Sequence, residues 1–221
     1  MNKTWYIIPA RMGSKGLPKK NRILFKETAN IIPDGIKDSV VVSSDDIEIL
    51  KISSEYGFIS HQRSAELASD TASIRDVLSK VILDLNISSE STIVLLYLTY
   101  PTRTWANVED AICFFNKHNG VSLLCKKQIH TSPYLMFFEE EGLTGTKVID
   151  HDLCRRQDYR NCFEVSHFIG VFNSDQINIL DTNLWNKDTI FMPIDNKIDV
   201  DYKKDLDLFN LGDNLASKNN S

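Results

Sequence analysis

Short runs of β-branched and other apolar residues alternate with helical patterns along this chain of 221 residues, and that alternation constrains the fold most strongly. Such runs, bounded by turn residues, are typical of buried strands. Strands that alternate with helices build an α/β sheet whose strands are mostly parallel. We therefore expect a Rossmann-like α/β fold with a mostly parallel central sheet flanked by helices. The expected strands cover residues 5–9, 39–43, 92–98, 121–125, 168–172 and 189–192.

Four helices are expected between or after these strands, each with a polar residue that can cap its first turn. In the second helix, apolar residues recur with the period of an amphipathic helix. The stretch 22–39 contains Pro33 and Gly35 and leaves little room for a further full helix. The candidate caps are Ser44, Asp45 or Asp46 for the first helix, Asp70 or Thr71 for the second, Thr104 for the third and Asp201 for the fourth.

One stretch breaks the alternation. Residues 134–138 and 146–149 are separated by an acidic turn that ends in Gly142, a pattern typical of a β-hairpin. We expect a single domain over residues 1–216, within which about residues 127–165 form a hairpin excursion from the main sheet. Residues 217–221 are polar and are expected to form a frayed tail.

The loop after the first expected strand concentrates positive charge. Every ionisable side chain from Arg11 to Lys26 is basic, although the chain has a formal net charge of −5. Gly13 and Gly16 let the backbone approach a ligand closely and turn its N–H groups toward that ligand. Parallel sheets bind ligands beyond the carboxyl ends of their strands, where this loop lies. The loop therefore predicts a polyphosphate site, with a solvated basic turn as the alternative.

The same loop resembles a family signature. The string Ile8-Pro9-Ala10-Arg11-Met12-Gly13-Ser14-Lys15-Gly16, followed by Lys20-Asn21, is similar to the signature of acylneuraminate cytidylyltransferases, the CMP-sialic acid and CMP-nonulosonic acid synthetases. The resemblance implies a Rossmann-like nucleotidyltransferase fold whose basic loop holds the triphosphate of CTP. It also implies catalytic roles for Arg11, Lys15 and Lys20. The nucleotide-binding residues that it implies in this loop are Ala10, Arg11, Ser14, Lys15, Lys20 and Asn21.

A second block of similarity begins at Arg63. The segment Arg63-Ser64-Ala65-Glu66-Leu67-Ala68-Ser69-Asp70 is similar to an Arg-x-x-Glu-Leu-Ala-x-Asp segment of the same family. The resemblance implies that Arg63 and the turn at Ala72 and Ser73 line the cytosine pocket. An arginine ahead of a capped helix is compatible with that role, because it can donate to a base carbonyl. The residues alone leave a surface arginine as the alternative.

Asp199 and Asp201 flank Val200 shortly after the last expected strand. On an extended segment, residues i and i+2 point the same way, so the two carboxylates can share one hard cation. Magnesium takes few protein carboxylates and fills its remaining positions with phosphate oxygens and water. The family resemblance extends to this Asp-x-Asp and implies an Mg²⁺ site there. Two other interpretations stay open, in which Asp201 caps the last helix and Asp199 ends a strand.

The sugar side of the site resembles the family less closely. Residues 95–104 are similar to the family's Leu-Leu-Gln-Pro-Thr-Ser-Pro-Leu-Arg-Thr, but Tyr97 replaces the glutamine that helps to hold the sugar. Arg156 and Gln157 resemble an Arg-Gln pair near the sugar pocket, whereas residues 165–168 lack the family's Asn-Gly. The resemblance therefore implies Tyr97, Arg156 and Gln157 as sugar-binding residues. Pseudaminic, legionaminic or another α-keto acid sugar fits this pattern as well as N-acetylneuraminate.

The net charge, the apolar runs and the cysteine spacing indicate which partners and which compartment to expect. An acidic total charge argues against general nucleic-acid or membrane-surface binding. No apolar run is long enough to span a bilayer, and the apolar segment after Met1 is too short for a signal-peptide core. The four cysteines form no Cys-x-x-Cys pair, which is typical of reduced cytosolic thiols. We expect a cytoplasmic protein.

Together these features predict a CTP-dependent cytidylyltransferase that transfers CMP to the anomeric hydroxyl of a nonulosonic acid, releases pyrophosphate and uses Mg²⁺. Its partners would be CTP and the acidic keto sugar, and the resemblance implies a homodimer formed through the hairpin region. Two alternatives remain. One is a metal-dependent glycosyltransferase that uses Asp199 and Asp201 as a DxD motif, which the number of loop cations disfavours. The other is a non-catalytic nucleotide-binding protein.

Overall fold

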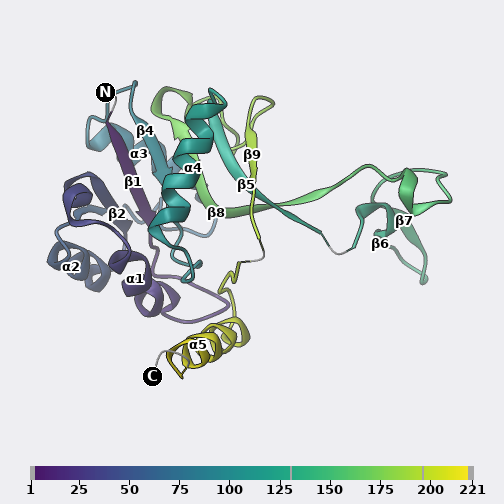
Figure 1. Ribbon diagram of the computed structural model, residues 1–221, viewed down its shortest axis with the longest axis horizontal. Helices are drawn as coiled ribbons and strands as arrows, with labels where there is room; N and C mark the ends of the chain where they lie inside the picture. The colour runs from purple at the N-terminus through teal and green to yellow at the C-terminus, as the bar shows by residue number, and fades with distance from the viewer. Residues whose placement is uncertain (1–2, 130, 196, 219–221) are drawn as a thin grey trace.

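A seven-stranded sheet forms the centre of the molecule in the computed structural model, which describes residues 3–129, 131–195 and 197–218. The strand order is β3-β2-β1-β4-β8-β5-β9 (Figure 1). Neighbouring strands are parallel except at β8, which runs antiparallel to both β4 and β5. The strands are β1 (Thr4–Pro9), β2 (Val40–Ser44), β3 (Ile59–Gln62), β4 (Thr92–Leu95), β5 (Ser122–Gln128), β8 (Phe163–Asn173) and β9 (Ile190–Pro193).

Helices cover both faces of this sheet. Ile8 and Val42 belong to one buried cluster, together with residues of α1, α2 and α4, whereas Ile7 and Val41 belong to a second cluster with α3. Successive side chains on a strand point to opposite faces, so a sheet covered on both sides requires apolar residues at consecutive positions. The expected α/β architecture is confirmed. The helices are α1 (Lys20–Asn30), α2 (Ile47–Glu55), α3 (Ile74–Asp84), α4 (Trp105–Lys117) and α5 (Lys203–Lys218), and the 3₁₀ segments are η1 (Asp34–Ser39), η2 (Pro133–Leu135), η3 (Arg156–Asp158) and η4 (Ser174–Gln176).

Two of the four expected helix caps agree with the structure, those of α2 and α4. Asp46 caps α2 by accepting from the N–H of Glu48, and Thr104 forms a capping box with Asn107 at the start of α4. The cap of α3 is Ser73, not Asp70 or Thr71. Asp70 has a different role because its carboxylate pairs with cations of the loop after β1.

Helix α1 was not expected, because the stretch 22–39 was predicted to leave little room for a full helix. It begins at Lys20, inside the basic loop, and is complete at Asn30, ahead of Pro33. Leu24, Phe25, Thr28 and Ala29 are buried on its inner face, which explains why a short segment suffices. Strand β3 was also missed, because its four residues at the sheet edge carry no long apolar run.

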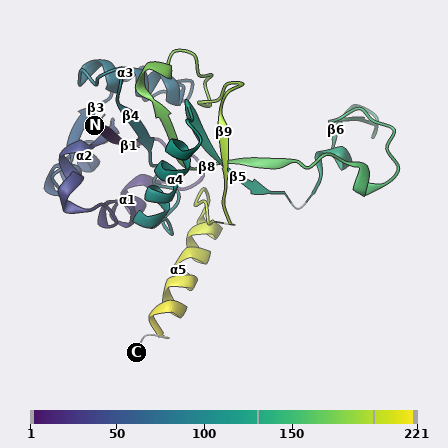
Figure 2. The same ribbon diagram turned by 45° about the horizontal axis from the view of Figure 1, so that its top comes forward.

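The expected hairpin excursion is present. Strands β5 and β8 continue past the sheet as a two-stranded arm, with Gln128 opposite Phe163 near its end. The arm carries a lobe that contains the antiparallel hairpin of β6 (Phe137–Glu139) and β7 (Gly145–Lys147). Figures 1 and 2 show this lobe projecting well away from the sheet and from α5. The expected tail overlaps α5 at residues 217 and 218, and residues 219–221 lie outside the described part of the chain.

A buried arginine joins the strands that carry the site. Arg103 is 2% exposed and donates to the carbonyl oxygens of Tyr97 and Phe168, each at 2.7 Å. It also donates to Thr28 on α1 at 3.3 Å. Burial lowers the pKa of Arg103 to about 10, so the group remains a cation at neutral pH. Its guanidinium therefore ties β4, β8 and α1 together by charge-assisted hydrogen bonds.

Replacing Arg103 by alanine is expected to lower the free energy of unfolding by about 3 kcal/mol, because two buried carbonyls lose their donor and a cavity remains. Urea denaturation measures this loss. Arg75→Ala is the matched control, since Arg75 is partly exposed, donates one long hydrogen bond to the carbonyl of Leu180 at 3.3 Å and lies 3.5 Å from the carboxylate of Asp76. That variant should cost less than about 1 kcal/mol. Equal losses in the two variants would contradict the structural role of Arg103.

Candidate nucleotide-binding cleft

A cleft of about 650 Å³ opens at the carboxyl ends of β1 and β4. Its walls come from the loop after β1, the segment between β3 and α3, the segment after β4, His167 on β8, and residues 199–202 before α5. A parallel sheet offers its ligand site at this edge. Ten of the residues predicted for a site line this cleft, namely Arg11, Ser14, Lys15, Lys20, Asn21, Arg63, Ala72, Tyr97, Asp199 and Asp201.

The loop after β1 is anchored at both of its ends. Ala10 is fully buried, and its N–H donates to the carbonyl of Ser43 on β2 at 2.9 Å, so it supports the loop without lining the cleft. Asn21 donates from its side-chain amide to the carbonyl of Arg11 at 2.8 Å. Lys19 has a left-handed backbone (φ 58°), which turns the chain into α1. These contacts hold the basic side chains at the mouth of the cleft.

The three cations predicted for catalysis pair with carboxylates across the cleft. Arg11 and Lys15 each lie 2.7 Å from Asp70, and Lys20 lies 2.7 Å from Asp201. Hydrogen bonds from Lys15 and Arg11 lower the pKa of Asp70, so this carboxyl is charged at neutral pH. Lys20 is the least exposed of the three cations, with 12% of its side chain accessible. A polyphosphate entering the cleft would meet cations that are already gathered and would replace carboxylates as their partner.

Gly16 lets the loop approach the segment before α5. A Cβ atom at this position would collide with the carbonyl oxygen of Asp201 and crowd the ring of Tyr202. A glycine is therefore required for the loop to bring Lys20 and Asp201 together. Gly13, in the same loop, has open space where its Cβ would stand.

This difference predicts the effect of two matched substitutions. Gly16→Ala is expected to move the loop off Asp201 and to weaken CTP binding about tenfold or more, which calorimetric titration would measure. Gly13→Ala introduces no collision in the free protein and should leave thermal unfolding unchanged. If Gly16→Ala bound CTP as tightly as the unmodified chain, the close approach would have no functional importance.

The predicted cytosine-side residues occupy one wall of the cleft. Arg63 is 8% exposed, and its Nε donates to the hydroxyl of Ser43 at 3.0 Å. One terminal nitrogen of Arg63 is buried with no hydrogen-bond partner among the described residues. Ala72 lines the cleft beside it, whereas Ser73 serves as the cap of α3 and does not. The surface-arginine alternative is wrong, because this guanidinium is buried.

Asp199 and Asp201 lie in an extended segment that is fixed by the residue between them. Val200 is fully buried, and its N–H donates to the carbonyl of Thr99 at 2.8 Å. One carboxylate oxygen of Asp199 is buried without a hydrogen-bond partner in the described structure. Asp201 turns its carboxylate to Lys20, and Asp205 accepts from the backbone at the start of α5 instead. Asp201 therefore does not act as the side-chain cap of that helix.

These two carboxylates fit the demands of Mg²⁺. A buried carboxylate oxygen without a donor is a ready ligand for a hard cation. No group of three or more potential protein ligands gathers within the described residues. Two carboxylates are still sufficient for a magnesium site that takes its remaining ligands from substrate phosphates and water.

Tyr97 lines the cleft and lies beside His167, for which no role was predicted. Its ring lies 5.6 Å from that of His167 in an edge-on arrangement. Burial raises the pKa of Tyr97 and lowers that of His167, so both side chains are neutral at neutral pH. One ring nitrogen of His167, Nδ1, is buried without a partner in the described structure. The two departures from the family pattern therefore lie together on one wall.

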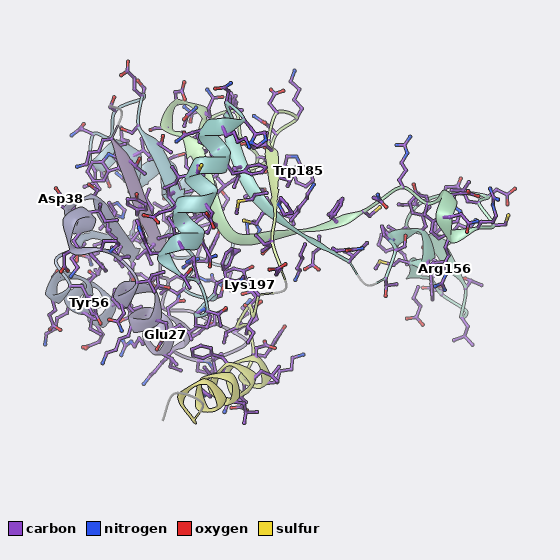
Figure 3. All side chains as sticks on the ribbon, in the orientation of Figure 1. Glu27, Asp38, Tyr56, Arg156, Trp185 and Lys197 are labelled. Carbon is purple, nitrogen blue, oxygen red and sulfur yellow. The ribbon has the colours of Figure 1, made fainter. Side chains whose placement is uncertain are left out.

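Arg156 and Gln157 do not join this cleft within one chain. Both lie on η3 in the lobe, and Figure 3 shows Arg156 far from the sheet and from Lys197. Both side chains are exposed. Their sequence position, in the excursion between β5 and β8, explains the separation, because the arm carries the whole segment outward. The two residues that the resemblance implies for sugar binding therefore do not line the cleft of their own chain.

Asp70 is the cleft residue whose role the sequence did not indicate. It was expected to be a helix cap, yet it neutralises two cations of the loop after β1. The signal that could have found it is the family-like segment from Arg63, which ends on this residue. Tyr100 and His167 also line the cleft and were not assigned a role.

Solved structures with this architecture are nucleotidyltransferases. A CMP:2-keto-3-deoxy-manno-octonic acid synthetase complexed with CTP superposes with a TM-score of 0.67 at 15% identity, over 98% of this chain and 100% of that one. A Francisella tularensis 2-C-methyl-D-erythritol 4-phosphate cytidylyltransferase superposes with a TM-score of 0.60 at 13% identity, over 95% and 99%. At such low identity the likeness defines the fold class, which is the Rossmann-like nucleotidyltransferase fold.

Sequence comparisons find cytidylyltransferases within that class. Residues 5–111, just under half of the chain, match the family model described as cytidylyltransferase. An N-acylneuraminate cytidylyltransferase of Streptococcus agalactiae serotype V is 28% identical over 76% of this chain and 43% of its own length. A pseudaminic acid cytidylyltransferase of Campylobacter jejuni is 35% identical over 45% of this chain and 47% of its own length. The aligned part thus spans less than half of each relative.

Proposed function

We propose that this protein transfers CMP from CTP to the anomeric hydroxyl of a nonulosonic acid and releases pyrophosphate. The observation that carries the proposal is the cation cluster of Arg11, Lys15 and Lys20, which faces Asp199 and Asp201 across one cleft. Nucleotidyl transfer places negative charge on the α-phosphate and on the departing pyrophosphate. A cleft with fixed cations on one side and a carboxylate pair on the other suits that distribution of charge.

In the proposed reaction, the anomeric oxygen attacks the α-phosphorus of CTP, and the bond from that phosphorus to the bridging oxygen of the pyrophosphate breaks. The proton of the hydroxyl is released to solvent. Arg11, Lys15 and Lys20 exchange their carboxylate partners for phosphate oxygens and stabilise the leaving group. Because no covalent enzyme intermediate is needed, positioning and charge stabilisation carry most of the rate.

We propose Asp199 and Asp201 as the residues that hold Mg²⁺. A magnesium ion bound there would neutralise phosphate oxygens and favour in-line attack. The buried, unpartnered oxygen of Asp199 supports this assignment, because its desolvation is costly unless a cation or donor compensates it. The ion pair of Asp201 with Lys20 would open when the triphosphate takes Lys20 as its partner.

The side chains of Tyr97 and His167 favour an acceptor sugar that differs from the one bound by a pocket with glutamine at this position. They form a neutral wall that offers one aromatic face and one imidazole nitrogen. The similar proteins include an N-acylneuraminate cytidylyltransferase and a pseudaminic acid cytidylyltransferase, so both acids belong in a substrate test. 2-Keto-3-deoxy-manno-octonic acid belongs there too, as the substrate that the name of the structural neighbour gives.

A product test separates this function from its alternative. Phosphorus NMR of a reaction with CTP, Mg²⁺ and the acid should show pyrophosphate and a phosphodiester-linked CMP. A glycosyltransferase would leave CTP intact and would release a nucleoside diphosphate from a nucleotide sugar. CTP that binds but remains unchanged with every acid would indicate a non-catalytic nucleotide-binding protein.

We further propose that two copies associate through the lobe. The lobe exposes large apolar side chains, with 65% of Phe137, 62% of Phe138 and 96% of Leu143 accessible. Exposed apolar patches of this kind mark interaction sites. In such a homodimer the arm of one copy would extend toward the other, which is how we propose that Arg156 and Gln157 reach a sugar. Their basic and amide groups suit the carboxylate of an acidic keto sugar.

Phe137→Ser combined with Phe138→Ser is expected to convert the dimer to a monomer in analytical ultracentrifugation, because the apolar patch becomes polar. Ile47→Ser is the matched control, since Ile47 on α2 is 72% exposed and lies outside the lobe. The control should sediment like the unmodified chain. An unmodified chain that sediments as a monomer at micromolar concentration would contradict the proposed interface.

A further inference from the structure

A line of hydrogen bonds runs from the outer surface of the protein to the arginine of the cleft. Asp84, the last residue of α3, lies 3.1 Å from Nε2 of His61 on β3. Nδ1 of His61 lies 3.0 Å from the hydroxyl of Ser43 on β2. The same hydroxyl lies 3.0 Å from Nε of Arg63. Four residues from three segments, namely α3, β2 and the end of β3, thus form one continuous line of hydrogen bonds.

The donor and acceptor chemistry of Arg63, Ser43 and Asp84 favours one direction for each bond in this line. A guanidinium only donates, so the Ser43 oxygen accepts from Arg63. The hydroxyl proton of Ser43 then has His61 Nδ1 as its acceptor, which requires the neutral imidazole with its proton on Nε2. That proton is donated to Asp84, whose carboxyl pKa is lowered by hydrogen bonds from Lys80 and His61. The carboxylate at the surface therefore selects the tautomer that Ser43 needs.

Because these residues are buried, a hydrogen-bond donor left without an acceptor among them would be destabilising. Ser43 is fully buried, and His61 and Arg63 are 7% and 8% exposed. If His61 carried its proton on Nδ1, both His61 and Arg63 would donate to Ser43. The hydroxyl proton of Ser43 would then have no acceptor among the contacts described. A buried donor without an acceptor is strongly disfavoured, so the inferred direction, with the proton of His61 on Nε2, is the more stable one.

The end of this line of hydrogen bonds is a cation that lines the cleft. Among the described residues Arg63 belongs to no ion pair, and its Nη2 is buried and has no hydrogen-bond partner. Burial is the main cause that lowers the pKa of Arg63 to about 10, which leaves it charged at neutral pH. A cation in the wall of a ligand cleft is stabilised by an acceptor from the ligand. Because Nε is held by Ser43, the orientation of the guanidinium is restrained.

We propose that Asp84, His61 and Ser43 are positioning residues that orient the guanidinium of Arg63 toward an acceptor atom of the bound nucleotide. This proposal rests on the function proposed above, since the acceptor is part of CTP. None of the three residues lines the cleft. They act through Arg63, and they connect nucleotide affinity to a carboxylate on the far side of β3.

Substitution of Asp84, at the surface end of this line of hydrogen bonds, tests the proposal with little risk to folding, because the side chain of Asp84 is 36% exposed. Asp84→Ala is expected to raise the KM for CTP about tenfold, equivalent to about 1.4 kcal/mol, with kcat changed less than about twofold. Lys80→Ala is the control, since it removes the ion pair with Asp84 and leaves His61 and Asp84 in contact. The control should keep the KM of the unmodified chain.

A double-variant cycle distinguishes positioning from a general structural effect. Arg63→Ala alone should raise the KM by more than tenfold. If Asp84 acts through Arg63, adding Asp84→Ala to Arg63→Ala should change the KM no further. Additive effects of the two substitutions, or an unchanged KM in Asp84→Ala, would overturn the proposal.

The tautomer of His61 provides a readout that needs no nucleotide. Nitrogen NMR of the free protein should show the Nε2–H tautomer, with the signal assigned by its loss in His61→Asn. The Nδ1–H tautomer would overturn the proposal. If the unmodified chain failed to bind CTP at all, the proposed function would be the part that failed. The tautomer of His61 would then still test whether the hydrogen bonds from Asp84 to Arg63 form in the free protein.

Discussion

Lys20→Ala is expected to reduce the rate of pyrophosphate release from CTP by about a hundredfold to a thousandfold. Lys20 is the least exposed of the loop cations, and it lies in the first turn of α1, held by its pair with Asp201. A preorganised cation stabilises the charge that develops on the leaving group, and removal of one such donor has effects of this size. Initial rates at saturating CTP measure the change.

The matched control for this variant is Lys26→Ala. Lys26 belongs to the same helix and the same run of basic residues, but it is exposed and does not line the cleft. Its removal should change the rate less than about twofold. Because Asp201 is half-exposed, Lys20→Ala should also unfold close to the temperature of the unmodified chain. A rate that stays within threefold of the original would rule out Lys20 as a catalytic cation.

Asp199→Asn is expected to have an effect of similar size, a loss of about a hundredfold or more in turnover. The substitution keeps the shape of the side chain and removes the negative charge that we propose attracts Mg²⁺. The residual rate should respond to higher magnesium concentrations than the rate of the unmodified chain does. Magnesium titrations of both proteins measure the shift in the half-saturating concentration.

Asp195→Asn is the control for this charge change. Asp195 is an exposed aspartate of the same segment and does not line the nucleotide cleft. It should leave both the rate and the magnesium dependence unchanged. Equal behaviour of the Asp199 and Asp195 variants would show that the buried, unpartnered oxygen of Asp199 does not bind the metal.

Local patterns predicted the sheet and much of the cleft. The apolar run of β1 and the basic loop after it are contiguous in sequence, so their residue types indicated both a buried strand and an anionic ligand. Asp199 and Asp201 were indicated by their spacing together with the family resemblance, and both line the cleft. The pairing of Lys20 with Asp201 was beyond such reasoning, because these residues are 181 positions apart and meet only when α5 docks below the loop.

Other features depend on tertiary context that a single sequence does not show. Helix α1 was missed because Pro33 and Gly35 obscured a helix that already ends at Asn30. Arg156 and Gln157 carry a plausible recognition pair, yet the arm of β5 and β8 removes them from their own cleft. The hydrogen bonds from Asp84 to Arg63 join α3, β2 and the end of β3, and they form only when these three segments pack together.

The proposed transfer of CMP can be followed as pyrophosphate release with CTP and magnesium over four acids: N-acetylneuraminic, pseudaminic, legionaminic and 2-keto-3-deoxy-manno-octonic acid. Reactions with EDTA and with ATP, GTP or UTP serve as controls. We expect magnesium-dependent release with CTP and at least one nonulosonic acid, and little release with the other nucleotides. Absence of release with every acid, while CTP binds in the cleft, would contradict the proposed transfer.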